Sequence, residues 1–408
     1  MDKNDVQHYQ WLTSATADAQ LTLLAQPTPV SPGQFAKLRE QFGQTRAEIL
    51  VTQSKLRKRS LEKFSVGGEM FFTEIGLQQA TDKAIASFKA NQIKQLFPQV
   101  RHVTDLCCGI GGDLMALAQH FDVTGVDADP VVAWLAGYNA ALENPRGTVN
   151  IQQQDVNKTA LESTDWIHLD PDRRADGQRH TSIDGYQPSA GFMNSLLQAR
   201  DISHRGLSIK LAPATKIPEN WLPSMTSRQW IQSRGECRQQ LVTFASGNRS
   251  VQAIGVNGNG QSEWKIGFAV DNIRESHEVP LATECEEYLY EPEPAVLAAR
   301  LDASWALEHQ LSAIRYRIAY YTSSNSMTRP GSRRFRVVEC LPFDRKKIKG
   351  WLRQRNVGRL EIKKRGITLS PERLRKELQL RGNNEMSLII IGNLDTHQKA
   401  IAILAKRE

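Results

Sequence analysis

Hydrophobic residues recur at two different spacings along the chain, and the spacing changes near Val103. From about residue 8 to 97, apolar positions recur every three to four residues, the spacing typical of amphipathic helices. From Val103 onward, short apolar runs such as "VTDLCC", "VTGVDA", "GTVNIQQQD", "WIHLDPD" and "LSIKLAP" alternate with helical stretches. This alternation predicts βα units that build a mostly parallel sheet, so the expected fold class is α/β.

The same patterns divide the chain into four expected parts. A helical region of residues 1–95 precedes a sheet domain of residues 96–275. Residues 276–332 begin with a stretch rich in Glu and Pro and end in "TSSNSMTRPGSRR", which predicts a helical connector and a linker. Residues 333–408 combine the strand-like segments "RFRVVECLPF", "GRLEIKKRG" and "MSLIIIGN" with two basic helices, which predicts a small basic α+β domain.

Charge is distributed unevenly between these parts. The formal net charge is +8, but residues 333–408 hold 20 Lys+Arg and 8 Asp+Glu, or +12, which leaves the first 332 residues at −4. A mildly acidic body that carries a basic end is typical of an enzyme with a module for a polyanion such as RNA. A solvated lysine-rich face would explain the same count.

Cysteine usage and apolar runs limit the class of protein. The five cysteines include the adjacent pair Cys107 and Cys108 and form no CxxC motif, which argues against a disulfide framework or a zinc site. We therefore expect reduced cysteines and no bound metal. Neither a signal pattern at the N-terminus nor an apolar run of about 20 residues is present, so we expect a cytoplasmic protein without a membrane partner.

A glycine cluster followed by an acid carries the clearest chemical signal. Gly109, Gly111 and Gly112 follow one apolar run, and Asp127 ends the next. Glycines at this place let a ligand approach the backbone, and a carboxylate on the second strand suits two ribose hydroxyls. The dinucleotide fingerprint needs a third glycine where Met115 stands, and no Gly-Lys-Ser/Thr follows. The residues alone thus favour a nucleotide-containing cofactor other than NAD, FAD or a nucleoside triphosphate.

Four motifs in one order resemble those of class I S-adenosylmethionine-dependent methyltransferases, which have a Rossmann-like, doubly wound sheet. These are "DLCCGIGGD", "VTGVDADP", "QQD" and "HLDPDRR". The resemblance implies S-adenosylmethionine as the cofactor and Asp170 and Pro171 as the catalytic pair. The cofactor contacts that it implies are Asp105, Gly109, Gly111, Asp113, Asp127 and Asp155.

The chain is also similar to a narrower bacterial group that is related to the trimethylguanosine synthase branch and ends in a THUMP-like domain. "EPEPAVLAA" and the basic segment after residue 333 carry this similarity, which implies RNA as a partner. In place of Asp/Asn-Pro-Pro and an aromatic, the chain has Asp170-Pro171-Asp172-Arg173-Arg174, where an arginine plane can replace the ring or hold a phosphate. The expected substrate-binding residues are Arg173, Arg174, Lys346, Lys347, Lys363, Lys364 and Arg365.

Several of these residues also have a purely structural explanation. Asp155 can cap a helix, Lys210 can cover a sheet edge, and Phe71 and Phe72 can belong to the core. Cys107 and Cys108 are expected to pack at a strand end rather than act as nucleophiles. At the level of function, the sequence predicts a methyltransferase that acts on RNA or a nucleobase nitrogen. The alternative is a non-catalytic RNA-binding or assembly protein that retains the cofactor fold.

Overall fold

The structure is a computed structural model that describes the 408 residues except 1–2, 27–28, 174–181, 200–204 and 393–398. The chain folds into two compact units. Unit 1 comprises Met1–Arg234, Arg238–Arg249 and Val256–Glu263, and unit 2 comprises Gly235–Cys237, Ser250–Gly255 and Trp264–Glu408. Within the described residues, no helix combines the length and the apolar character that a membrane span needs.

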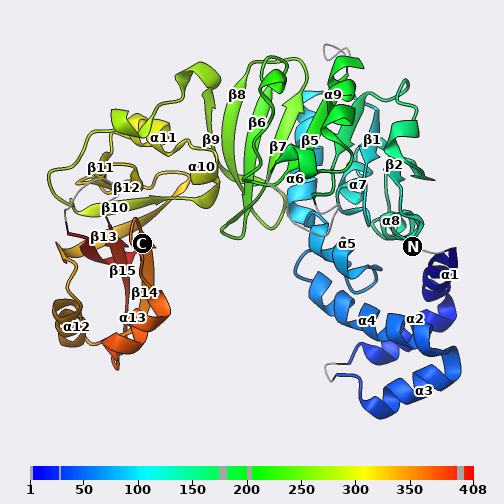
Figure 1. Ribbon diagram of the computed structural model, residues 1–408, viewed down its shortest axis with the longest axis horizontal. Coiled ribbons are helices and arrows are strands. Elements are labelled where there is room, and N and C mark those ends of the chain that lie inside the picture. Colours follow the sequence, from blue (N-terminus) through cyan, green and yellow to red (C-terminus); the bar gives the residue numbers. More distant parts are fainter. Residues whose placement is uncertain (1–2, 27–28, 174–181, 200–204, 393–398) are drawn as a thin grey trace. The chain divides into compact units, whose positions relative to one another are not determined.

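Unit 1 begins with helices, as the spacing of apolar residues predicts (Figure 1). Side chains cap several of them. Ser31 and Gln34 form a capping box, and Asp82 accepts a hydrogen bond from the backbone N–H of Ile85. The helices are α1 (Lys3–Leu12), α2 (Ala15–Leu24), α3 (Pro32–Phe42), α4 (Gln44–Ser60), α5 (Glu74–Gln79) and α6 (Lys83–Leu96).

A nine-stranded sheet follows, in the order β3-β2-β1-β4-β5-β7-β6-β8-β9. The first five strands are parallel to their neighbours, and β7 runs antiparallel to β5. Helices α7 (Gly112–Leu117), α8 (Pro130–Leu142) and α9 (Ala190–Ala199) connect the parallel strands. The strands are β1 (His102–Leu106), β2 (Asp122–Asp127), β3 (Val149–Gln153), β4 (Trp166–Leu169), β5 (Gly206–Leu211), β6 (Ser227–Ser233), β7 (Glu236–Phe244), β8 (Ser250–Val256) and β9 (Ser262–Ala269).

The strand order reverses at β1, which has β2 on one side and β4 on the other. In open α/β sheets, ligands bind in the crevice beyond the carboxyl ends of the strands at such a reversal. The predicted α/β class and its doubly wound sheet are confirmed. Strand β9 was not expected, although the turn residues "NGNG" precede it and "SEWKIGFA" alternates polar and apolar residues.

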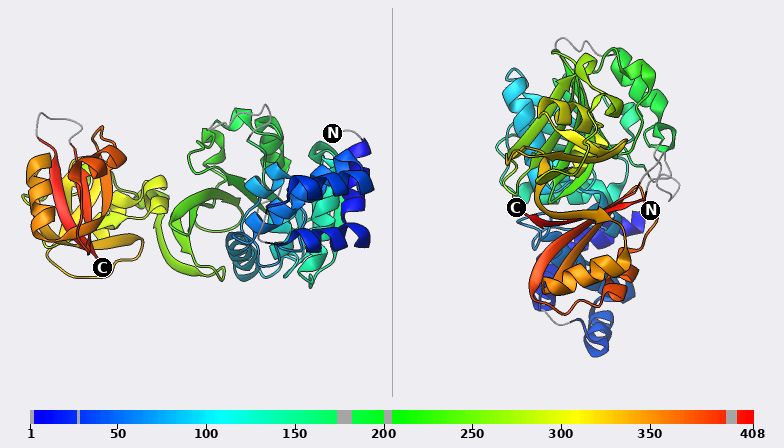
Figure 2. Two further views of the ribbon diagram at one scale, coloured as in Figure 1. Left: turned by 90° about the horizontal axis from the view of Figure 1, so that it is seen from below. Right: turned by 90° about the vertical axis from the view of Figure 1, so that its left-hand side faces the viewer.

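Unit 2 is built around a second sheet, in the order β11-β12-β10-β13-β16-β15-β14, in which only β14 and β15 pair in parallel. Helices α12 (Arg345–Gln354) and α13 (Pro371–Leu378) lie beside the strands of this sheet (Figure 2). Their apolar residues pack against β14, β15 and β16. The strands are β10 (Tyr288–Pro292), β11 (Ser312–Arg315), β12 (Ile318–Ser323), β13 (Ser332–Pro342), β14 (Val357–Arg365), β15 (Asn384–Ile391) and β16 (Ile401–Arg407).

The expectation of a helical connector and linker at residues 276–332 is wrong. This segment supplies β10, β11 and β12 to the second sheet, together with the short helices α10 (Pro294–Ala298) and α11 (Asp302–Glu308). Strand β10 pairs with β13, with Tyr288 opposite Arg336. Its strand character was hidden because "YLYEP" lies between glutamates and prolines, which usually mark loops.

Candidate functional site

The glycine loop between β1 and α7 leaves its backbone open at one residue. Gly109 and Gly111 have φ values of +57° and +93°, which side chains other than hydrogen rarely allow. A Cβ at Gly109 would meet nothing within 4 Å, so a ligand can approach the backbone there. A Cβ at Gly112 would lie 3.0 Å from the carbonyl oxygen of Thr81, so this glycine serves close packing.

Asp127, at the end of β2, joins the strand to this loop. Its two carboxylate oxygens accept hydrogen bonds from the backbone N–H groups of Gly109 and Asp129, each at 3.0 Å. Burial raises the pKa of Asp127, and these two donors oppose the shift. Because each carboxylate oxygen has two lone pairs, both oxygens retain capacity for a pair of ligand hydroxyls.

Asp105, near the end of β1, is a buried carboxylate that lacks a hydrogen-bond partner among the described residues. Asp105 pairs in register with His168 on the neighbouring strand β4 and is 1% exposed. Burial raises its pKa well above the usual value. A buried carboxylate without a partner is costly, and a ligand with an ammonium group would supply one. Asp105, Gly109 and Asp127 therefore fit a cofactor that combines an amine with a ribose.

Asp113 is held inside the protein instead. Its Oδ1 lies 2.6 Å from Nζ of the buried Lys89 on α6, and its Oδ2 accepts a hydrogen bond from Thr81 Oγ1 at 2.7 Å. His168 Nε2 lies 3.4 Å from the same Oδ2. Burial opposes ionisation, but Lys89 and His168 hold the pKa of Asp113 well below its usual range. The geometry therefore gives Asp113 an internal role beneath the loop, and its predicted contact with the cofactor has no support in these distances.

Asp170 follows β4 and pairs with a lysine that the sequence did not identify as part of the site. Its Oδ2 lies 2.6 Å from Nζ of Lys210 on β5, which also donates to the carbonyl of Gln79 at 3.3 Å. Burial alone would lower the pKa of Lys210, but Asp170 and Asp113 raise it above its usual value. Strand β5 lies between β4 and β7, so Lys210 does not cover a sheet edge.

The next acid of the motif contacts the N-terminal helices. Asp172 Oδ1 accepts a hydrogen bond from Gln79 Nε2 at 2.7 Å, and its backbone pairs with Gln187. Pro171 is buried and Arg173 is half-buried, while Arg174 lies outside the described residues. The end of α5 therefore contacts the strand-end motif through two groups of Gln79.

Lys63 stabilises the C-terminal end of α5. Its ammonium donates to the carbonyl oxygens of Leu77, Gln78 and Ala80, at 2.7, 3.1 and 2.9 Å. Burial lowers the pKa of Lys63 to about 8, and the neighbouring positive charge of Lys210 contributes. The carbonyls at a helix C-terminus lack intrahelical partners, so a lysine at this position stabilises the segment that contacts Asp172.

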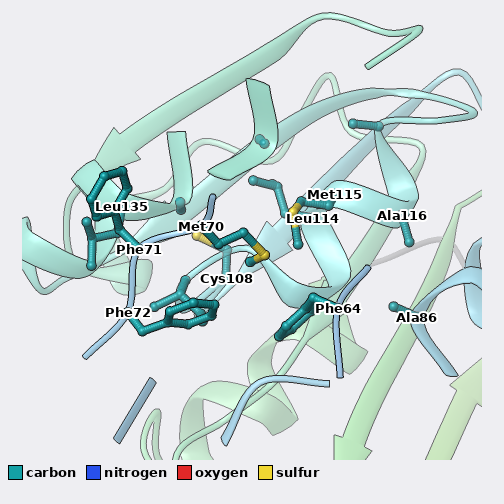
Figure 3. Packing of buried hydrophobic residues seen from close by; sticks show 14 of the residues in the cluster. Phe64, Met70, Phe71, Phe72, Ala86, Cys108, Leu114, Met115, Ala116 and Leu135 are labelled. Atoms are coloured by element: carbon teal, nitrogen blue, oxygen red, sulfur yellow. The ribbon is translucent and has the colours of Figure 1, made fainter. Parts of the chain in front are cut away.

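A buried amide connects the N-terminal region to the glycine loop. Asn139 on α8 accepts from the backbone N–H of Phe71 at 2.9 Å and donates to the carbonyls of Phe71, at 2.9 Å, and Ile110, at 3.0 Å. Phe71 and Phe72 are each 1% exposed and pack near Cys108, Leu114 and Leu135 (Figure 3). The core interpretation of both phenylalanines is confirmed, as is the packing role of the two adjacent cysteines at the strand end, whose pKa values burial raises.

Asp155 is exposed and caps a short 3₁₀ helix, Val156–Lys158. Its Oδ1 accepts from the backbone N–H of Asn157 at 2.9 Å and from the Asn157 side chain at 2.7 Å. The capping interpretation is confirmed, and its contact with an adenine stays a prediction. Both roles are compatible because Oδ2 takes no part in the cap.

The basic residues of the second unit divide into exposed and internally paired groups. Lys346, Lys347 and Lys364 are exposed. Lys363 lies 2.8 Å from Glu291, and Arg365 lies 3.2 Å from the same carboxylate, with side-chain exposures of 14% and 25%. The geometry therefore supports a surface role for the first three and an internal role for the last two. Trp351 packs in the core between α12 and the sheet.

Lys89, Lys210 and Gln79 were missed because their partners are far away in sequence. Gln79 and Lys210 contact each other across 131 positions, and Lys89 and His168 lie 79 positions apart. The linear sequence offers only weak signals, such as a lysine within the apolar strand "LSIKLAP". A charge in an interior strand requires a partner, and that requirement was the available signal.

Comparisons with known proteins agree with this architecture. Residues 332–407 match the family described as THUMP domain-like. The chain is 27% identical over 374 residues to a protein of two Mycobacterium tuberculosis strains named as an uncharacterized S-adenosylmethionine-dependent methyltransferase, covering 86% of this chain and 94% of the relative. The crystal structure of a candidate methyltransferase from Porphyromonas gingivalis superposes with a TM-score of 0.75 and 20% identity, covering 100% of this chain and 99% of that one. The chain thus shares the fold of that methyltransferase structure, and residues 332–407 are similar to THUMP-like domains.

Proposed function

We propose that this protein is an S-adenosylmethionine-dependent methyltransferase that modifies a nitrogen of RNA or of a nucleobase. The observation that supports the proposal best is the Asp170–Lys210 pair, with Oδ2 and Nζ 2.6 Å apart, at the strand ends where the sheet order reverses. The named relatives and the methyltransferase fold support the same activity class.

Three residues would hold the cofactor. Asp105 would accept the ammonium of its methionine part, the open backbone at Gly109 would allow close approach, and Asp127 would accept the ribose hydroxyls. When bound, the cofactor supplies a methyl group that is already activated as a sulfonium. The protein therefore needs to bind, orient and exclude water, rather than to generate a strong nucleophile.

Asp170 would orient the acceptor. Its Oδ2 is held by Lys210, so the carboxylate has a fixed direction and can accept a hydrogen bond from an N–H of the substrate. Such a bond directs the nitrogen lone pair and stabilises the positive charge that develops on the nitrogen. Gln79 and Asp172 would form the adjacent wall of the acceptor site, because their side chains are joined at 2.7 Å.

RNA is the proposed substrate class because of the second unit. The THUMP-like match at residues 332–407 and the exposed Lys346, Lys347 and Lys364 support an interaction with phosphates. The relation to the trimethylguanosine synthase branch stays a prediction from sequence, and so does the use of Arg173 and Arg174 in place of a stacking aromatic.

Transfer of a labelled methyl group tests the proposal. Purified protein is incubated with labelled S-adenosylmethionine and with RNA and protein fractions from a strain that lacks the gene. We expect label in RNA with the wild type, and a loss of about 100-fold or more with Asp170→Ala at nearly unchanged cofactor affinity. Asp271→Ala, an exposed acid of the second unit, serves as the control. Wild-type turnover in Asp170→Ala would contradict the role of Asp170, and RNA binding without transfer to any fraction would support the non-catalytic alternative.

A further inference from the structure

Two thiols of the second unit line the same hollow and interact with each other. Cys285 precedes β10 and Cys340 lies on β13, the strand that pairs with β10 in antiparallel register. Their interaction raises the pKa of Cys285 and lowers that of Cys340, and both are free thiols. The two residues are far apart in sequence, so their proximity is a product of the fold.

The backbone that follows Cys285 is fixed. The N–H of Glu286 donates to Thr322 Oγ1 at 2.9 Å, and the N–H of Val337 donates to the carbonyl of Glu287 at 2.8 Å. These bonds tie the segment to β12 and to β13, the strand that carries Cys340. A disulfide requires Cα atoms and Cβ vectors that face each other, and this tie keeps the two thiol-bearing segments adjacent.

Both thiols can be reached from solvent. Together with Arg315 and Glu286, they line a hollow of about 660 Å³. Cys340 is exposed and Cys285 is half-buried. The hydrogen bond from Cys285 lowers the pKa of Cys340, and the charge of Arg315 acts in the same direction. By contrast, burial raises the pKa values of Cys107, Cys108 and Cys237. Cys340 therefore has the character of an attacking thiolate, and the other three do not.

We propose that Cys285 and Cys340 form a reversible disulfide when the protein meets a hydroperoxide. The Cys340 thiolate attacks the peroxide, which gives a sulfenic acid and releases hydroxide from hydrogen peroxide. The Cys285 thiol then attacks that sulfur, and the sulfenic oxygen leaves as water. In balance, two thiols and one hydrogen peroxide give one disulfide and two waters, so the thiols are oxidised and the peroxide is reduced.

The disulfide would restrain the strand that holds the basic helix α12. Glu339, which precedes Cys340, accepts a hydrogen bond from the Trp351 indole N–H and pairs with Arg355 at 3.6 Å. Linking Cys340 to the fixed segment at Cys285 reduces the freedom of β13 at this point. The effect of oxidation should therefore be concentrated near α12, in the part of the chain that carries Lys346 and Lys347.

Counting thiols in the full chain tests the proposal without any activity assay. The reduced protein is treated with a small excess of hydrogen peroxide, then blocked with N-ethylmaleimide and analysed as intact protein and as peptides. We expect two fewer maleimide adducts than the five cysteines allow, one linked peptide pair containing residues 285 and 340, and full reversal by dithiothreitol.

Serine variants provide the controls. Cys340→Ser should retain all four remaining thiols under the same treatment. Cys285→Ser should lose one thiol, because Cys340 stops at the sulfenic acid, whereas Cys237→Ser should still lose two. Circular dichroism checks that each variant is folded. Five adducts in the oxidised wild type, or a linked pair that contains Cys107, Cys108 or Cys237 instead, would overturn the proposal. The result is independent of methyl transfer, so it is unaffected if the proposed function is wrong.

Discussion

The two units use charge in opposite ways. In unit 1, Lys89, Asp113 and His168 are buried beneath the glycine loop, each less than 9% exposed, and their charges or protons depend on one another. In unit 2, pairs such as Arg359 and Glu385, with side-chain exposures of 77% and 69%, lie in solvent. In water such a pair contributes little, whereas in the interior the loss of one partner leaves an uncompensated charge. The exposed charged pairs of the basic segment should therefore matter less for stability than the buried charges beneath the glycine loop.

Breaking a buried pair and an exposed pair compares the two regions directly. Lys89→Met leaves Asp113 buried without its cation, and we expect a loss of about 3–5 kcal/mol in the free energy of unfolding. Arg359→Ala should cost less than about 1 kcal/mol. Urea unfolding of both variants measures the difference, and equal losses would contradict the comparison.

Asp127 is a half-buried acid that we expect to bind the ribose of the cofactor. Asp127→Ala removes two charge-assisted hydrogen bonds to ribose, each of about 1.5–3 kcal/mol, so affinity for S-adenosylmethionine should fall at least about tenfold. Asp122→Ala, at the opposite end of β2, is the matched control, since its carboxylate accepts hydrogen bonds from the backbone and side chain of Thr148, away from the glycine loop. Isothermal titration with unchanged affinity in Asp127→Ala would exclude this assignment.

The partly buried ammonium of Lys63 should make the free energy of unfolding depend on pH, which an exposed lysine should not. Its folded-state pKa of about 8 lies below the ordinary value of 10.5, so between these values the unfolded chain binds a proton that the folded chain has released. The wild type should therefore gain stability relative to Lys63→Met as pH rises from about 8 to 10.5, by at most about 1.4 kcal/mol per pH unit. Below pH 8 the difference should be constant. Urea unfolding at several pH values measures the slope, with Lys37→Met on the exposed side of α3 as control.

The smallest expected effects concern the exposed lysines. Replacing Lys346, Lys347 and Lys364 with alanine should leave stability nearly unchanged and weaken binding to single-stranded RNA. The slope of log K against log salt should fall by about 0.7 for each phosphate that the variant no longer neutralises. Lys363→Ala is the neighbouring control, because its ammonium is paired with Glu291 and its loss should affect folding rather than the salt slope. An unchanged slope in the triple variant would remove these three residues from the RNA interface.

Local patterns predicted the central strands β1, β4 and β5 of the first sheet well, because these apolar runs are largely buried. They failed for β9 and for β10, and the strand at β10 is specified by pairing with β13 rather than by its own sequence. The same distinction applies to the site. Gly109 and Asp127 could be predicted because the backbone conformation and the strand end both require those residue types. Lys210 could not, since its role depends on Asp170, which is 40 positions away.

The net charge of residues 333–408 is also a poor measure of the positive charge on the surface. A count over residues 333–408 treats all cations alike, yet Lys363 and Arg365 both pair with Glu291, an acid outside that range. Glu291 lies on β10 and the two cations on β14, so only the tertiary fold brings them together. The sequence therefore overestimates the positive charge that is available to a ligand.

The hydrogen bonds of Asn139 limit where this protein can be divided in a gene fusion. Its amide satisfies backbone groups of Phe71 and Ile110 at once, and these belong to the N-terminal region and to the glycine loop. A gene fusion that transplanted only the catalytic sheet would leave this buried amide with groups unsatisfied, and the loop would lose its support. A fusion protein that keeps the catalytic sheet therefore has to keep the N-terminal helices as well.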